Sequence, residues 1–234
     1  MIERNIPTTS HGRFLVDADA GPQSPLLVGF HGYAEPAENE YERLNSLPGA
    51  ERWIRVAVQA LHRFYRGRSG DVVASWMTTQ DRALAIADNC DYVSRVIDSV
   101  AAEWSASSTL VVSGFSQGVA MAFRAAVNST RSVCGVIACG GDIPPELDPH
   151  SLSAIPAVLI GRGNRDEWYT EEKLMADERR LREAGVRVEV VCFDGGYEWL
   201  QEFSRAAGYF LEVCSDLPPL GLRPPSPGGK GPAR

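Results

Sequence analysis

Positive charge is scarce in this sequence. Its 234 residues include 23 Lys and Arg against 30 Asp and Glu, which leaves a net charge of −7 and an isoelectric point near 5.2. Phosphate binding needs a basic face, so this balance argues against nucleic acid as a partner. The one local basic cluster, formed by Arg63, Arg66 and Arg68, is interpreted as a solvated loop.

Long hydrophobic runs and paired cysteines are also missing. Residues 1–5 contain no apolar signal core, and no later stretch is long enough to span a bilayer. The five cysteines are odd in number and share no CxxC or metal-ligand spacing, and three of them sit in apolar runs as small buried side chains do. A reduced compartment fits them best, so we expect a cytoplasmic protein with no bound metal.

Segments typical of strands and helices alternate along the chain. This order predicts an α/β fold with a mainly parallel sheet and helices on both of its faces. The expected strands cover residues 25–30, 53–59, 110–112, 133–138, 157–160 and 186–193. The expected helices cover residues 81–104, 117–127, 171–183 and 198–213. We therefore predict one domain over residues 1–215, followed by a disordered Pro/Gly-rich tail over residues 216–234.

Gly114-Phe115-Ser116-Gln117-Gly118 matches the pattern G-x-S-x-G. The pattern alone is common, but here a predicted strand precedes it and an Ala-rich helical segment follows it. That strand–turn–helix setting is what a nucleophilic serine needs, because a strained turn projects its oxygen above the sheet. Gly114 and Gly118 remove side chains that would collide in the turn. Ser116 is therefore the candidate nucleophile.

Gly29-Phe30-His31-Gly32-Tyr33 follows the first strong strand. In this architecture a loop after that strand donates a backbone N–H to the developing oxyanion, and the residue after the serine donates a second. The candidate donors are the amides of Tyr33 and Gln117. His31 resembles a free catalytic base, but we expect it to brace the loop through hydrogen bonds.

A third candidate follows a later strand. Asp166 lies in the turn 161–168, directly after the predicted strand 157–160. An aspartate at the carboxyl end of this strand is placed to orient a histidine and to stabilise its imidazolium. The adjacent Glu167 is the alternative.

With these motifs assembled, the chain resembles the phospholipase/carboxylesterase family of α/β hydrolases, which includes acyl-protein thioesterase-like enzymes. The resemblance covers residues 26–211 and includes the Gly-Gly-x-Glu-Trp segment at 195–199. It implies an α/β-hydrolase domain without a large lid, often a homodimer, that cleaves small-molecule carboxylic esters or thioesters without metal or other cofactor. By this resemblance Ser116 is the nucleophile and Asp166 is the acid. Residues 75–78 resemble the acyl-side pocket wall, with Trp76 and Met77 as substrate-binding residues, and packing in the core is an equally open alternative.

Tyr197 departs from the family pattern, which requires histidine at this position. A histidine with a pKa of about 6.5 accepts the serine proton, whereas a phenol with a pKa of about 10 is already protonated at neutral pH. Removing the base from a serine triad lowers turnover by about 10⁶ in the subtilisin case. We therefore predict an ester or thioester hydrolase whose turnover is strongly impaired.

Two alternatives remain open. His62 and His150 both follow predicted strands, so either is placed near the catalytic edge of the sheet as a replacement base, with Glu198 as a weaker candidate. Alternatively, the chain is a non-catalytic homologue that binds a ligand in the old pocket without cleaving it.

Overall fold

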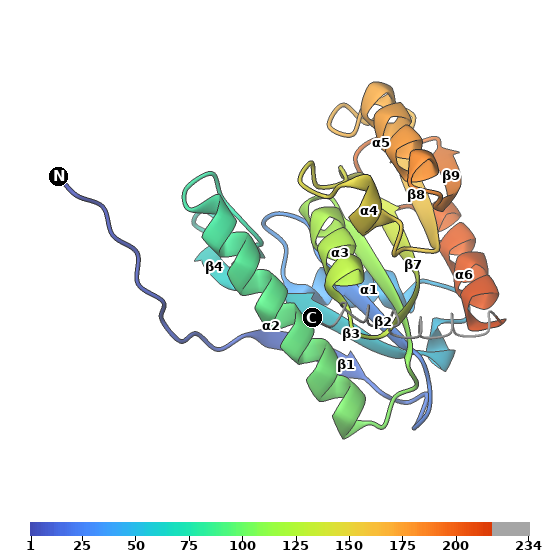
Figure 1. Cartoon of the computed structure of the whole chain (residues 1–234), viewed down its shortest axis with the longest axis horizontal. Coiled ribbons are helices and arrows are strands. Elements are labelled where there is room, and N and C mark those ends of the chain that lie inside the picture. Colours follow the sequence, from blue (N-terminus) through green and yellow to red (C-terminus); the bar gives the residue numbers. More distant parts are fainter. Residues whose placement is uncertain (217–234) are drawn as a thin grey trace, which may run out of the picture.

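The computed structural model describes residues 1–216, so the predicted tail lies outside the described residues except at its first position. A seven-stranded sheet forms the centre of the molecule, in the order β1-β3-β2-β6-β7-β8-β9 (Figure 1). All neighbouring pairs are parallel except β1 and β3. Its strands are β1 (Arg13–Asp17), β2 (Leu26–Phe30), β3 (Ile54–Gln59), β6 (Thr109–Phe115), β7 (Ser132–Cys139), β8 (Ala157–Gly163) and β9 (Arg187–Phe193).

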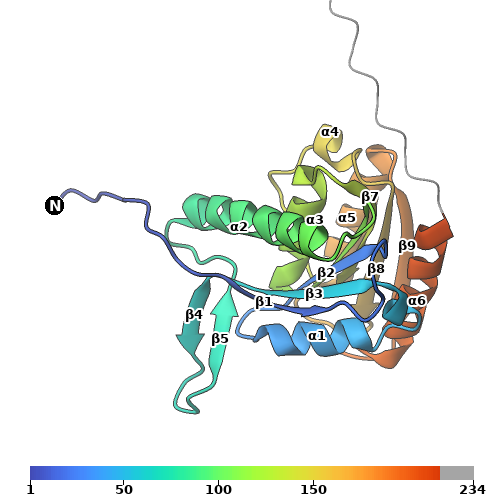
Figure 2. The same ribbon diagram turned by 90° about the horizontal axis from the view of Figure 1, so that it is seen from below.

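Helices cover both faces of the sheet, as Figure 2 shows from below. One face packs against α2, α3, α4 and α5, and the opposite face packs against α1 and α6. The helices are α1 (Ala37–Asn45), η1 (Ala50–Arg52), α2 (Arg82–Glu103), α3 (Gln117–Asn128), α4 (Pro149–Leu152), α5 (Glu171–Glu183) and α6 (Gln201–Asp216). The predicted fold class is confirmed, and the six predicted strands are present within a few residues of their expected ends.

The central strands form because both of their faces are buried. Every residue of β2 and of β3 is buried, which is why these segments are almost continuously apolar and do not alternate. Three of the five cysteines, Cys134, Cys139 and Cys214, are buried free thiols, as expected for small core side chains. No helix within the described residues is both long and apolar enough to cross a membrane.

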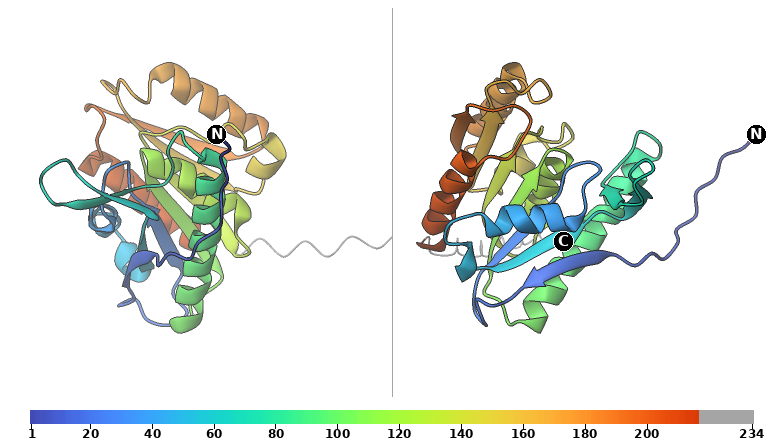
Figure 3. Two further views of the ribbon diagram at one scale, coloured as in Figure 1. Left: turned by 90° about the vertical axis from the view of Figure 1, so that its left-hand side faces the viewer. Right: turned by 180° about the vertical axis from the view of Figure 1, so that it is seen from behind.

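Several elements differ from the sequence prediction. A separate hairpin, β4 (His62–Tyr65) with β5 (Val72–Ser75), forms where a solvated basic loop was expected. The last helix begins at Gln201 and not at residue 198, because residues 195–198 form a tight turn in which the amide of Glu198 donates to the carbonyl of Gly196 at 3.1 Å. Residues 1–12 form neither helix nor strand, and their first part runs away from the domain (Figure 3).

Candidate active site

Ser116 occupies the turn between β6 and α3. Its backbone angles, φ 56° and ψ −123°, lie in a region that side-chain-bearing residues rarely adopt. The turn is held because the amide of Ser116 donates to the carbonyl of Cys139 at 2.9 Å. A Cβ atom on Gly118 would lie 1.9 Å from the carbonyl oxygen of Phe30, and one on Gly114 would lie 2.4 Å from the carbonyl oxygen of Gly118. Both glycines are therefore required by the close packing of this turn.

His31 braces the loop after β2, as expected, and does not face the pocket. Its side chain is fully buried. The ring Nδ1 lies 2.7 Å from the carbonyl oxygen of Gly32, which makes Nδ1 the donor, and Nε2 accepts from the amide of Ala60 at 3.1 Å. Burial lowers the pKa of His31, although the Gly32 carbonyl and nearby carboxylates act in the opposite direction. A neutral ring with both nitrogens engaged is a structural support and not a base.

A half-buried ion pair supports the same loop from the α1 side. The amide of Gly32 donates to Oε2 of Glu35 at 2.8 Å, and Arg43 donates to both carboxylate oxygens of Glu35 at 2.6 and 2.7 Å. Burial acts to raise the pKa of Glu35, but the hydrogen bonds and charge of Arg43 outweigh it and hold this pKa below its ordinary value. The guanidinium also lies 4.2 Å from the ring centre of Phe115, next to the serine. Sequence reasoning did not identify this pair.

The loop lies directly against the nucleophile. A Cβ atom on Gly32 would be 3.2 Å from Cβ of Ser116. Within the described chain, the amides of Tyr33 and Gln117 donate to no protein acceptor. Both predicted oxyanion donors therefore remain available to a ligand oxygen.

The segment at 75–77 is fastened to the turn by the side chain of Gln117. Its Oε1 accepts from the amide of Trp76 at 2.9 Å, and its Nε2 donates to the carbonyl of Met77 at 3.1 Å. Trp76 is fully buried, and its indole N–H donates to the carbonyl of His31 at 2.8 Å. Of the two predicted substrate-binding residues, Met77 lines the pocket, whereas Trp76 packs in the core and supports the loop.

Tyr197 lies where the catalytic base is expected, and its hydroxyl donates a hydrogen bond to Oγ of Ser116. The ring is 40% exposed and packs between Phe115 and Trp168, with ring centres 5.4 and 6.4 Å away. Burial is the largest cause of a raised pKa for Tyr197, the bond to Ser116 acts against it, and the negative charge of Asp166 adds to it. The phenol is therefore protonated at neutral pH and offers Ser116 a donor, not an acceptor.

Asp166 is buried close to Tyr197, whereas the alternative Glu167 is exposed. Its Oδ1 accepts from the amides of Trp168 and Tyr169 at 2.8 and 2.9 Å. These bonds fix the carboxylate within the turn after β8. It makes no hydrogen bond to the hydroxyl of Tyr197, so the structure contains a Ser–Tyr pair with a carboxylate nearby and not a continuous chain of three residues.

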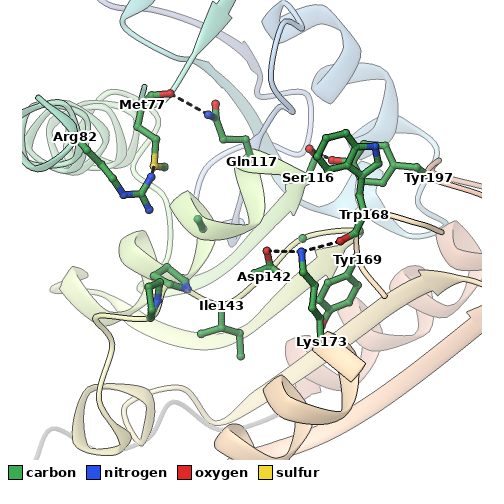
Figure 4. Close-up of a pocket in the computed structure, with 15 residues that line it drawn as sticks. Met77, Arg82, Ser116, Gln117, Asp142, Ile143, Trp168, Tyr169, Lys173 and Tyr197 are labelled. Carbon is green, nitrogen blue, oxygen red and sulfur yellow. Dashed lines mark hydrogen bonds and ion pairs between the residues drawn. The ribbon is translucent and has the colours of Figure 1, made fainter. Parts of the chain in front are cut away.

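A pocket of about 270 Å³ opens beside Ser116 (Figure 4). Tyr197 forms part of its wall and also part of the wall of a second, more open hollow of about 620 Å³ lined by Glu35 and Trp199. The phenol ring thus divides the surface around the nucleophile. Among residues 1–216, no group of three or more His, Cys, Asp or Glu side chains is arranged to hold a metal ion.

The other candidate bases are not brought to the nucleophile. His62 lies on β4 and lines a separate hollow with Asp88 and Tyr92, and His150 lies on the outside of α4. Oε1 of Glu198 accepts from the amide of Gly196 at 3.0 Å. None of the three lines the pocket that contains Ser116.

Comparison with known proteins gives a family match and several solved structures with a similar fold. A family model described as Phospholipase/Carboxylesterase matches residues 11–215. Among solved structures, esterase PE8 is 22% identical over 87% of this chain and 98% of its own, with a TM-score of 0.65. Zea mays acyl-protein thioesterase 2 is 18% identical over 87% and 99%, with a TM-score of 0.67. Bacillus cereus carboxylesterase is 13% identical over 87% and 94%, with a TM-score of 0.66. Comparison with curated proteins gives no match.

Proposed function

Because this chain belongs to the phospholipase/carboxylesterase family of α/β hydrolases, we propose that it is built to cleave carboxylic esters or thioesters through an acyl-Ser116 intermediate. The observation that carries the proposal is the backbone of Ser116, held at φ 56° beside a pocket that Ser116 and Gln117 both line. In the reaction, Oγ of Ser116 attacks the carbonyl carbon. The amides of Tyr33 and Gln117 then donate to the oxyanion, which is usually the largest single contribution to such catalysis.

We further propose that turnover is strongly reduced, because position 197 lacks a base. The serine proton must leave Oγ during attack and reach the leaving group when the tetrahedral intermediate collapses. A protonated phenol cannot accept the Oγ proton and so has no such proton to pass to the leaving group, and its hydrogen bond occupies one of the two lone pairs of Oγ. The oxyanion amides and substrate binding alone retain roughly 10³–10⁴ over the uncatalysed rate.

The test compares hydrolysis of p-nitrophenyl esters by this chain, by Tyr197→His and by the double variant Tyr197→His with Ser116→Ala. We expect Tyr197→His to raise kcat/KM by at least about 10³, toward the 10⁶ that a missing base costs in subtilisin. The double variant should lose that gain. Ordinary turnover by the unchanged chain, dependent on Ser116, would show that another group acts as the base. Failure of Tyr197→His to gain any Ser116-dependent turnover would contradict the proposed function.

Labelling with a fluorophosphonate provides an independent measurement. It requires attack by Ser116 but no later hydrolysis, so it reports the nucleophile alone. We expect slow labelling of this chain, fast labelling of Tyr197→His, and none of Ser116→Ala.

A further inference from the structure

The pocket beside Ser116 contains an arginine that has no acidic partner within residues 1–216. Arg82 is the first residue of α2, and its Nη1 contacts Sδ of Met77 at 2.7 Å. The neighbouring Asp81 accepts a hydrogen bond from Asn5. Glu146, whose pKa Arg82 lowers slightly, is held in an ion pair by Arg124. The guanidinium therefore brings an uncompensated positive charge to the pocket wall.

The other charges in the pocket neutralise each other. Nζ of Lys173 lies 3.2 Å from Oδ2 of Asp142 and donates to the carbonyl of Trp168 at 2.7 Å. With Arg82, these are the three charged side chains that line the pocket, so its formal charge is +1. An unpaired positive charge does not stabilise the binding of a purely aliphatic acyl chain.

The nucleophile and the unpaired arginine lie on opposite sides of the pocket. Figure 4 shows Arg82 on one side of the pocket and Ser116 with Tyr197 on the other. Ala120, Ile143, Pro144 and Pro145 supply apolar parts of the pocket lining, alongside the polar side chains of Gln117 and Asp142. An ester bound with its carbonyl at Ser116 and its acyl chain extended across the pocket would bring the end of that chain to the side on which the guanidinium lies.

We propose that this pocket receives an acyl group that ends in a carboxylate, so that the substrates are half esters or half thioesters of short dicarboxylic acids. This inference rests on the proposed function and names its substrate class. The guanidinium suits a carboxylate because its donors match the two carboxylate oxygens in one plane. The volume of about 270 Å³ is sufficient for an acyl chain of the length of adipate.

Binding to the unchanged chain provides the first test, because Tyr197 leaves the ester intact. Monomethyl adipate carries a terminal carboxylate, and methyl hexanoate is its neutral counterpart of the same chain length. We expect monomethyl adipate to bind more tightly in ligand-observed NMR titrations. Arg82→Gln should weaken its binding about five- to tenfold, as expected for a partly exposed charge-assisted contact, and should change methyl hexanoate by less than twofold. Raising the salt concentration should reduce the difference between the two ligands.

Two further variants separate this role from general damage to the pocket. Arg95→Gln is the matched control, because Arg95 lies on the same helix but pairs with Asp91 and lines a different hollow. It should leave both affinities unchanged. Asp142→Asn removes the partner of Lys173 and so adds a second unpaired cation. It should tighten monomethyl adipate severalfold, a gain that loss of structure does not produce.

Turnover in the Tyr197→His background provides the second test. Adding Arg82→Gln should lower kcat/KM for the p-nitrophenyl half ester of adipic acid about five- to tenfold and leave p-nitrophenyl hexanoate within twofold. Equal effects on the two esters, or absence of monomethyl adipate binding to the unchanged chain, would overturn the inference. If Tyr197→His cleaves no ester, the proposed function fails, and the binding experiment still decides whether the pocket selects a carboxylate.

Discussion

Glu40 is a fully buried carboxyl group directly behind the loop that carries the proposed oxyanion donor. It lies on α1, close enough to β2 that a Cβ atom on Gly29 would be 2.7 Å from its Cγ. Its oxygens meet Oγ of Ser113 at 3.3 Å and a guanidinium nitrogen of Arg43 at 3.2 Å. Burial raises the pKa of Glu40 from 4.5 to about 7, and Arg43 only partly offsets this because it is already bound to Glu35.

The raised pKa makes a definite prediction about stability. Below about pH 4.5 the carboxyl group is protonated in both the folded and the unfolded chain, so burial carries no ionisation penalty. Between pH 4.5 and 7 only the unfolded chain releases the proton, which increasingly favours unfolding. Above pH 7 the penalty is complete at about 3 kcal/mol, from a shift of about 2.5 pKa units at 1.36 kcal/mol each. Glu40→Gln removes this titration.

Urea unfolding followed by circular dichroism at pH 4.5, 6 and 8 measures the effect. The free energy of unfolding of Glu40→Gln, relative to the unchanged chain, should shift by about 2–3 kcal/mol in favour of the variant between pH 4.5 and 8. Subtracting the unchanged chain cancels the titration of all other groups. Glu42→Gln is the matched control, because it makes the same change at an exposed position of the same helix. A difference for Glu40→Gln that stays constant across this range would refute the assignment of a raised pKa.

Two other substitutions test the turn and the loop. Ser116→Gly should be more stable than Ser116→Ala by about 1 kcal/mol, because a positive φ penalises any residue with a Cβ atom. Calorimetry should show this as a Tm difference of roughly 2–4 °C. The opposite order would contradict the positive φ of Ser116. In the Tyr197→His background, Glu35→Gln should lower kcat about tenfold with little change in KM, because the amide of Gly32 loses its charged acceptor. Glu38→Gln, an exposed position in the first turn of α1, should leave steady-state rates unchanged, and an equal loss there would refute the role of Glu35.

The central strands and the turn at Ser116 could be predicted because their local sequence is dictated by their surroundings. Strands buried on both faces of a sheet are mostly apolar, so β2 is a continuous apolar run and β6 is apolar except at Thr109 and Ser113. The turn between β6 and α3 admits only glycine at two positions, and this requirement is visible in the sequence. The order of strand, turn and helix could therefore be predicted from the local sequence pattern.

The edge elements could not be predicted in the same way. β1 is half-buried along its whole length, and it exists because it pairs with β3 more than forty residues later in the chain. All four residues of β4 are exposed, so this strand has no buried face that distinguishes it from a solvated loop, although three of the four residues of its partner β5 are buried. Helix α1 carries two acidic residues in its first turn and buries one of them, Glu40. The sequence alone does not distinguish a buried glutamate from an exposed one.

The pair formed by Glu35 and Arg43 was missed for a related reason. One residue precedes α1 and the other lies in its last turn, a spacing that occurs on many solvent-facing helices. Their role depends on how the loop between β2 and α1 folds back to bring the amide of Gly32 to the carboxylate of Glu35. Conversely, His62 and His150 were placed near the nucleophile from strand order, but strand order fixes only the edge of the sheet and not the direction of a side chain after several loop residues.

The charges around position 197 suit a cation and not a phenolate. Asp166, Glu35 and Asp142 each act to raise the pKa of Tyr197, so the site resists the ionisation that would turn this residue into a base. The same carboxylates would favour an imidazolium, which must form transiently when a histidine accepts the serine proton. Burial, the largest cause of the raised pKa of Tyr197, acts against any charged group at this position, so it is the three carboxylates that suit histidine chemistry here. The electrostatic reason for expecting Tyr197→His to gain activity is thus independent of the family pattern, because it follows from the charges of this chain alone.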